Sequence, residues 1–384
     1  MCAADDVTEE TFARCRTLTP ESAVEVRGNV REDPRSPSGV ELAVRELEVI
    51  SLAEEYPLQK KDHGVDFLLD HRHLWLRSPR PEAILKIRAT VEKAVVAYLD
   101  DRGFIRVDAP ILTGTAAEGS TTLFELDYFG TPAYLSQSGQ LYNEANAAAL
   151  GRVYCCGPTF RAEKSKTRRH VMEFWMVEPE AAFLSHDENV ALAEGMVVAA
   201  VAAALRERRS ELELLGRDVA ALEAVRAPFP RLSYDDVVER LHADGCEVPW
   251  GENYGAEEES SLTANSVEPL VVEYFPRQTK AFYMKRHAAD PRLVDAMDIL
   301  APEGYGEIVG GSCRENDLGA LRAAMADQGV PEEPLRWYLD LRRYGGVPTA
   351  GFGLGVCRTV AWIAGLKHIR EAIPYPRMLN RLYP

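Results

Sequence analysis

The chain has 384 residues, of which 46% are hydrophobic, and a formal net charge of −16 at pH 7. This length suits one large domain and a small one, and the negative charge argues against a protein that coats nucleic acid with its whole surface. The seven cysteines have no paired spacing, which favours reduced thiols. No apolar run reaches the length of a membrane span and the acidic N-terminus lacks a signal-peptide core, so we expect a cytoplasmic protein without a membrane partner.

Residues 1–62 form a predicted N-terminal module. After a short helix, the segments 22–30 and 40–50 alternate apolar and polar residues on either side of a turn-rich loop. This pattern predicts a two-stranded hairpin. Such a hairpin is only marginally stable alone, so it needs a partner.

Residues 63–80 form a predicted linker to the large domain, 81–384. His63, His71 and His73 in this linker lack a standard metal-ligand spacing, so we interpret them as structural. A long helix is predicted over 81–102, and a strand follows it. The apolar stripe of this helix consists of Ile84, Ile87, Val91, Val95 and Tyr98. The stripe alone does not say whether it meets its own core or a second subunit.

Residues 154–180 predict a strand, a basic loop and a second strand. Arg161 and Glu163 leave the first strand, His170 ends the loop and Phe174 lies in the second strand. The loop contains Lys164, Lys166, Arg168 and Arg169. An arginine that faces a phenylalanine suits a nucleotide, because the guanidinium can hold a phosphate and the ring can stack on a base. The alternative is an exposed hairpin with a solvated basic tip.

The second half of the chain supplies carboxylates and glycines. A capping box at Ser185 predicts a long helix that ends at Gly216, and the charged residues 217–268 predict a surface insertion. Within 295–317, Asp298 and Glu307 are candidate Mg²⁺ ligands, since two carboxylates together with phosphate oxygens can complete an octahedral shell.

The stretch GFGLGVCRTVAWIAGL (351–366) has three alternate glycines before Arg358. Small residues let a backbone approach a ligand closely, and Arg358 can reach a phosphate. The earlier stretch, FRAEKSKTRRH…EFWMVEPE, resembles motif 2 of the class II aminoacyl-tRNA synthetases, and this later stretch resembles their motif 3. Their wording is similar to the asparaginyl branch. The resemblance extends from about residue 10 to the C-terminus.

The resemblance implies an α/β catalytic domain with a largely antiparallel sheet flanked by helices, preceded by a small β-hairpin. In the family this hairpin closes a five-stranded OB barrel that reads the anticodon. The earlier strands of that barrel have no counterpart here, so the chain is either a shortened paralogue or begins inside a longer protein. The helix 81–102 resembles motif 1, the dimer interface of the family, which implies a homodimer.

The resemblance also implies adenylation with ATP and Mg²⁺, in which the carboxylate of an amino acid attacks the α-phosphorus. Arg161 would hold the α-phosphate and the reacting carboxylate, Arg358 the γ-phosphate, and Phe174 would stack on adenine. Glu163 and His170 would surround the bent ATP. Asp298 and Glu307 would hold the metal.

The amino-acid pocket implied by the resemblance consists of Glu118, Gln140, Asn143, Glu178 and Arg314. Glu118 would receive the α-ammonium group from a closing loop, Gln140 would contact the same end, and Arg314 would bind the side chain. A carboxylate at Glu178 accepts an amide N–H and repels a carboxylate, which favours asparagine over aspartate. Without the family, Glu178 and Arg314 could form a plain buried ion pair.

Several positions depart from the branch. Cys357 stands where motif 3 has a glutamate, Cys313 precedes Arg314, Asn143 lies where the aspartyl branch has a lysine, and Thr122 replaces a glutamate. Our first hypothesis is therefore a specialised paralogue that adenylates asparagine or a close analogue. It would pass the acyl group to a small amine, or to an acceptor that it recognises without reading an anticodon. The alternatives are a ligase that charges tRNA-Asn and grips the acceptor stem with the basic loop, and a non-catalytic binding module. A thioester on Cys357 or Cys313 is a further hypothesis, which requires a lowered thiol pKa.

Overall fold

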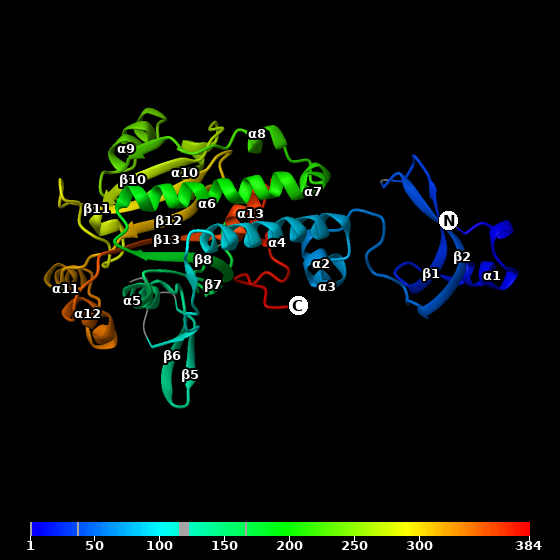
Figure 1. Ribbon diagram of the computed structural model, residues 1–384, viewed down its shortest axis with the longest axis horizontal. Coiled ribbons are helices and arrows are strands. Elements are labelled where there is room, and N and C mark those ends of the chain that lie inside the picture. The colour runs from blue at the N-terminus through cyan, green and yellow to red at the C-terminus, as the bar shows by residue number, and fades with distance from the viewer. Residues whose placement is uncertain (1, 37, 115–122, 166) are drawn as a thin grey trace. The chain divides into compact units, whose positions relative to one another are not determined.

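The computed structural model describes residues 2–36, 38–114, 123–165 and 167–384, coloured from blue to red along the chain in Figure 1. The chain divides into two compact units, Met1–Trp75 and Leu76–Pro384. Glu118 and Thr122 of the predicted closing loop and Lys166 of the basic loop lie outside the described residues.

The first unit contains the predicted hairpin. Strand β1 (Ala23–Glu32) pairs antiparallel with β2 (Val40–Ser51), and the register shifts next to Gly28. A Cβ on Gly28 would lie 2.0 Å from the carbonyl oxygen of Ala43, so the bulge requires glycine. No third strand occurs among the described residues of this unit. Its helices are η1 (Ala4–Asp6), α1 (Glu9–Thr17), α2 (Val65–Asp70) and α3 (Arg72–Trp75).

Two of the linker histidines, His63 and His71, are packed and hydrogen-bonded around α2. The ring of Phe67 lies 4.8 Å from that of His63 and 4.2 Å from that of His71. The Nδ1 atom of His71 is 2.9 Å from the carbonyl oxygen of Phe67. These contacts are those of structural histidines.

An eight-stranded sheet organises the second unit. In spatial order its strands are β3 (Ile105–Arg106), β7 (Arg152–Phe160), β8 (Glu173–Ala182), β13 (Thr349–Gly355), β12 (Gly306–Cys313), β11 (Leu293–Ala301), β10 (Leu270–Pro276) and β9 (Arg231–Ser233). The central pairs are antiparallel and only the two edge strands pair in parallel. The largely antiparallel sheet expected from the sequence is confirmed. A small second sheet has the order β4 (Leu112–Thr113), β6 (Thr131–Leu135), β5 (Glu125–Tyr128).

Helices α4 (Pro79–Asp100) and α6 (His186–Glu207) run side by side over one face of the large sheet (Figure 1). Four members of the predicted stripe on α4 are buried against α6 in the same core cluster: Ile84, Ile87, Val91 and Val95. Gly195 of α6 makes room for Tyr98, because a Cβ there would lie 2.0 Å from the hydroxyl oxygen of Tyr98. Four of the five stripe residues therefore belong to the core of their own chain.

Helix α6 begins at the predicted capping box, in which Ser185 Oγ accepts from Glu188 N at 3.3 Å and Glu188 Oε2 accepts from Ser185 N at 2.9 Å. It ends at Glu207 instead of Gly216, and α7 (Arg209–Leu214) follows. Contrary to expectation, α6 is long and apolar enough to cross a membrane by length and composition. Because it packs on α4 and the sheet with more than half of its apolar window buried, it is explained as a core helix.

The prediction that residues 217–268 are a surface insertion is wrong. This segment supplies the edge strand β9, and α9 (Tyr234–Ala243) buries Tyr234, Val237 and Leu241 in a core cluster shared with β10 and β11. Helix α10 (Ala256–Thr263) packs on β11 and β12. The period-2 pattern of β9 is too short to be noticed in the sequence, yet its pairing with β10 makes the segment part of the domain.

Three further helices pack with α4 and α6 in one core cluster: α8 (Val219–Glu223), α13 (Val356–Ile363) and η4 (Ile369–Ala372). The remaining helices are α5 (Gln140–Leu150), η2 (Arg277–Thr279), α11 (Leu318–Asp327), η3 (Glu333–Leu335) and α12 (Arg336–Arg343).

Candidate active site

Two adjoining cavities lie on the face of the sheet that α4 and α6 leave uncovered. Side chains alternate along a strand, so Val177 and Met297 enter the core under the helices, whereas their neighbours Glu178 and Asp298 line the cavity. The large cavity has a volume of about 810 Å³, which suits a small-molecule substrate. The small cavity shares Arg161, Met176, Glu307 and Gly353 with it.

The small cavity gathers every residue predicted to surround ATP. Its lining includes Arg161, Glu163, His170, Phe174, Glu307 and Arg358. The guanidinium carbon of Arg161 lies 5.5 Å from the centre of the Phe174 ring. Arg358 Nη1 donates to the Glu307 carbonyl oxygen and to Glu307 Oε2, both at 3.0 Å. The arrangement presents one aromatic face and two guanidinium groups, the groups that a base and its phosphates need.

His170 also lies inside this cavity, in surroundings that disfavour its charged form. Burial and the nearby Arg358 charge lower the pKa of His170, and the Glu163 carboxylate at 3.7 Å opposes them. The Nδ1 atom contacts the hydroxyls of Ser165 and Thr167 within the basic loop. His170 therefore adds hydrogen-bonding capacity to the small cavity, in surroundings that disfavour its charged form.

The candidate metal ligands point into one space. A Cβ placed on Gly310 would lie 2.8 Å from Glu307 Oε1 and 3.3 Å from Asp298 Oδ1, so glycine leaves the space between the two carboxylates open. Burial raises the pKa of Asp298 to about 6, and the Glu307 charge adds to this. For Glu307, burial acts in the same direction, but the charges of Arg358, Lys280 and Arg161 outweigh it and lower the pKa.

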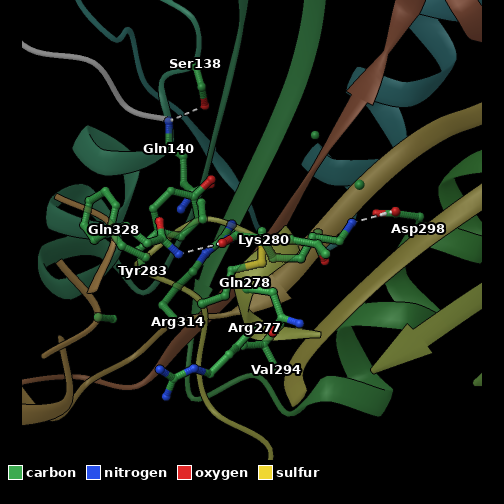
Figure 2. A pocket seen from close by; sticks show the side chains of 18 of the residues that line it. Ser138, Gln140, Arg277, Gln278, Lys280, Tyr283, Val294, Asp298, Arg314 and Gln328 are labelled. Atoms are coloured by element: carbon green, nitrogen blue, oxygen red, sulfur yellow. Dashed lines mark hydrogen bonds and ion pairs between the residues drawn. The ribbon is translucent and has the colours of Figure 1, made fainter. Parts of the chain in front are cut away.

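This donor set fits a hard divalent cation that also binds a substrate. In the described part of the chain no group of three or more His, Cys, Asp or Glu residues is arranged to hold a metal, so Mg²⁺ would take its other ligands from phosphates and water. Lys280, which the sequence analysis did not single out, neutralises Asp298 with Nζ 2.7 Å from Oδ2. Figure 2 shows Lys280 and Asp298 at one end of the large cavity and Ser138 and Gln140 at the other.

Glu178 and Arg314 both line the large cavity, and each has its own set of partners. Glu178 accepts from the Ser138 hydroxyl and, at 3.0 Å, from Gly139 N. Arg314 instead makes a two-point ion pair with Glu180, with Nη2–Oε2 at 2.8 Å and Nε–Oε1 at 3.1 Å. A Cβ on Gly351 would lie 2.2 Å from Glu180 Oε2, so this glycine leaves room for the pair.

The sequence analysis missed Glu180, although the motif VEPE contains the signal. Glu178 and Glu180 are two residues apart on β8, so both point to the cavity side of the sheet. The buried Arg314 is compensated by Glu180, and a second carboxylate, Glu178, lines the same cavity as Arg314.

Gln140 and Asn143 both lie on α5, but only Gln140 reaches the large cavity. Gln140 lines the large cavity and donates through Nε2 to Glu144 Oε1 at 3.2 Å. Glu144 is itself held by Tyr338 at 2.8 Å and Arg342 at 2.5 Å. Asn143 is fully buried behind the wall, where Nδ2 donates to the Glu178 carbonyl oxygen at 3.0 Å. Contrary to the prediction, Asn143 therefore supports Glu178 and does not line the cavity.

The two cysteines proposed as nucleophiles are buried. Cys313 lines neither cavity. Cys357 borders the small cavity, but its Sγ accepts a hydrogen bond from Arg88 Nη1 at 3.2 Å on the α4 side. Neither thiol faces the large cavity, where an acyl group would form.

The comparisons with known proteins agree with this geometry. The family of tRNA synthetases class II (D, K and N) matches residues 64–379. The asparagine--tRNA ligase of Desulforamulus reducens is 56% identical over 375 residues, covering 98% of this chain and 87% of its own length. That of Thermus thermophilus is 54% identical over 388 residues, covering 99% and 89%. These relatives are tRNA ligases, so the small-amine acceptor that the sequence analysis put first gains no support.

Solved structures of asparaginyl-tRNA synthetases are also similar to this chain. The asparaginyl-tRNA synthetase of Pyrococcus horikoshii complexed with asparaginyl-adenylate superposes with a TM-score of 0.97 at 45% identity, over 100% of this chain and 89% of that one. The Entamoeba histolytica asparaginyl-tRNA synthetase, also with asparaginyl-adenylate, gives a TM-score of 0.91 at 30% identity, over 98% and 88%. The chain therefore belongs to the class II tRNA synthetases (D, K and N), a family of ATP- and Mg²⁺-dependent ligases.

Proposed function

We propose that this protein is an asparagine--tRNA ligase that acts in two steps. First, a carboxylate oxygen of asparagine attacks the α-phosphorus of ATP, the bond from that phosphorus to the bridging oxygen breaks, and pyrophosphate leaves. Second, a ribose hydroxyl at the 3′ end of tRNA attacks the acyl carbon, its proton passes to the departing phosphate, and AMP leaves with the bonding electrons. The names of the relatives that cover nearly the whole chain support this assignment.

The small cavity supplies what the first step needs, namely alignment and charge. In this proposal Phe174 stacks on adenine, Arg161 holds the α-phosphate and the reacting carboxylate, and Arg358 binds the γ-phosphate end. Arg161 belongs to the lining of both cavities, so it can touch the nucleotide and the amino acid at once. Mg²⁺ held by Asp298 and Glu307 would neutralise phosphate charge.

The charge at the side-chain end of the large cavity is the observation that carries the choice of asparagine. Glu178, Glu180 and Arg314 together contribute two negative charges and one positive charge, a net −1. A substrate carboxylate would meet this excess negative charge in a buried site, whereas a neutral amide can donate to Glu178 and accept from Arg314. The net negative charge of these three residues therefore argues against aspartate as the substrate.

For the acceptor, the exposed cations of the basic loop support a contact with the tRNA acceptor stem. Lys164 and Arg168 are exposed, and neither makes an ion pair in the described part of the chain. Cations that face solvent can neutralise backbone phosphates. We keep a homodimer and a cytoplasmic location as parts of the proposal; since the α4 stripe is buried within the subunit, a dimer surface would use other exposed apolar residues, such as Ile105, Ile111 and Leu112.

The substrate assignment can be tested by pyrophosphate exchange with asparagine and with aspartate. The unaltered protein should exchange with asparagine only. Glu178→Gln should lower the preference for asparagine over aspartate by about tenfold, because one negative charge is lost beside the side chain. An unchanged ratio of the two kcat/KM values would mean that Glu178 has a structural role only, and exchange with aspartate alone would overturn the substrate assignment.

A further inference from the structure

Arg169 of the basic loop is enclosed by residues from other parts of the chain. Its Nη1 donates to Glu259 Oε2 at 2.8 Å, and its Nη2 donates to the Gly304 carbonyl oxygen at 2.6 Å and to the Ser260 hydroxyl. Glu259 and Ser260 lie on α10, within the segment first taken for a surface insertion. Unlike its exposed neighbour Arg168, Arg169 is half-buried: it anchors the loop and also borders the small cavity.

The same oxygen of Glu259 also reaches the candidate metal site. Glu259 Oε2 accepts from the backbone N–H of Glu307 at 3.0 Å, and the Glu307 carboxylate pairs with Arg358 at 3.0 Å. One carboxylate oxygen thus joins the basic loop, helix α10 and the start of β12.

Gly306 makes this junction possible. It has a φ of +73°, and a Cβ there would lie 2.1 Å from Arg169 Nη1 and 2.3 Å from Glu259 Oε2. Any side chain at this position would displace both partners. The packing therefore specifies where the Arg169–Glu259 pair sits.

We propose that Glu259 is a positioning residue for nucleotide binding, which acts through Arg169 on the loop that follows Arg161 and through the Glu307 backbone on the metal site. Glu259 lines neither the large nor the small cavity, so it does not touch the nucleotide itself. Arg169 and Arg358 are balanced by Glu259 and Glu307. Without Glu259, the half-buried Arg169 guanidinium loses its counter-charge, and the Glu307 backbone N–H loses its acceptor. The inference rests on the proposed adenylation at this site but not on which amino acid is used.

The test is nucleotide binding to the full chain in the absence of amino acid, measured by calorimetry with Mg²⁺ and a methylene analogue of ATP. Glu259→Gln should raise the Kd by about tenfold or more, as is typical when a partner behind a ligand is lost. The matched control is Glu257→Gln, an exposed carboxylate on the same helix, which should leave the Kd unchanged. An unchanged Kd in Glu259→Gln would overturn the inference.

A second variant separates positioning from general structural damage. Arg169→Gln removes the other partner and should raise the Kd by a similar factor, and the double variant should lose little more, because the pair acts as a unit. In all three proteins the KM for asparagine should stay within about twofold, since the amino-acid end is untouched. Additive losses, or an equal rise in the asparagine KM, would overturn the proposal. A loss of tRNA charging with intact nucleotide affinity would concern the proposed function and not this inference.

Discussion

The nucleotide end and the amino-acid end of the site are built in different ways. Around the small cavity, the side chains come mainly from two short stretches, 161–174 and 353–358, and they face the cavity directly. In the large cavity, Arg314 is held by Glu180 and Gln140 by Glu144, so these two lining residues each depend on a carboxylate that does not line the cavity; at the nucleotide end, Glu259 has the corresponding position behind Arg169. Groups that touch a ligand can therefore be encoded in a local motif, whereas selectivity depends on partners from distant segments.

The largest effect is expected at the nucleotide end. Arg161→Ala and Arg358→Ala should each reduce pyrophosphate exchange by about 10²–10³-fold or more, because each removes a charge that the transition state requires. Arg168→Ala, from the exposed tip of the same loop, is the matched control and should leave the exchange rate intact. Full activity in either site variant would remove the basis for assigning this cavity to ATP.

A smaller effect, on stability, is expected from Glu180, the ion-pair partner of Arg314 behind the large cavity. Glu180→Gln leaves Arg314 without its counter-charge at 3% side-chain exposure, so the free energy of unfolding should fall by about 3–5 kcal/mol. Urea unfolding measures this change. Glu173→Gln, a half-buried carboxylate on the same strand, should change the stability by only about 0.5 kcal/mol.

The same Glu180→Gln protein also bears on selectivity. The net charge around the substrate side chain would change from −1 to 0, so the relative use of aspartate should rise. If stability and the ratio of asparagine to aspartate exchange were both unchanged, Arg314 would not depend on Glu180, and the contrast between the two ends of the site would fail.

Mg²⁺ binding at Asp298 should depend on pH. Since burial raises the pKa of Asp298 to about 6, protons compete with Mg²⁺ for this carboxylate under mildly acidic conditions. The apparent Mg²⁺ affinity in nucleotide binding should be constant well above pH 6 and fall by up to about tenfold for each pH unit below it. Asp298→Asn should bind Mg²⁺ weakly and lose this dependence. A pH profile that is the same in both proteins would exclude Asp298 as a ligand.

The smallest effects are expected at the exposed loop tip. Lys164→Ala and Arg168→Ala should each raise the KM for tRNA by roughly threefold to tenfold at low salt, and less at high salt, because they remove contacts with backbone phosphates. Pyrophosphate exchange without tRNA should not change. If the tRNA KM stayed the same in the double variant, the acceptor stem would have to be bound elsewhere.

The sequence allowed the fold to be predicted, and it singled out residues that meet in the small cavity, because both depend on local patterns. The glycine-rich stretch directly precedes Arg358 in the chain. Arg161 and Phe174 belong to one hairpin, in which β7 pairs with β8. The partner of Arg314 could not be predicted in this way. Whether Glu178 or Glu180 meets it depends on the register across three strands, in which Glu180 lies opposite Gly351 and Gly351 opposite Ser312.

Two other features depend on long-range contacts that no local pattern contains. The stripe on α4 has the same period whether it packs on its own chain or on a second subunit, and only the tertiary structure shows that α6 covers it. Residues 217–268 are rich in charge, but Glu259 within them is stabilised by Arg169, ninety positions earlier. Long-range pairing of this kind leaves no periodic signal.

The central claim is tested most directly by charging total tRNA with labelled asparagine and ATP while pyrophosphate is followed in the same reaction. We predict stable asparaginyl-tRNA, formed in step with pyrophosphate release, and no charging with aspartate. Pyrophosphate release without charged tRNA would contradict the account, because adenylation would then serve another acceptor.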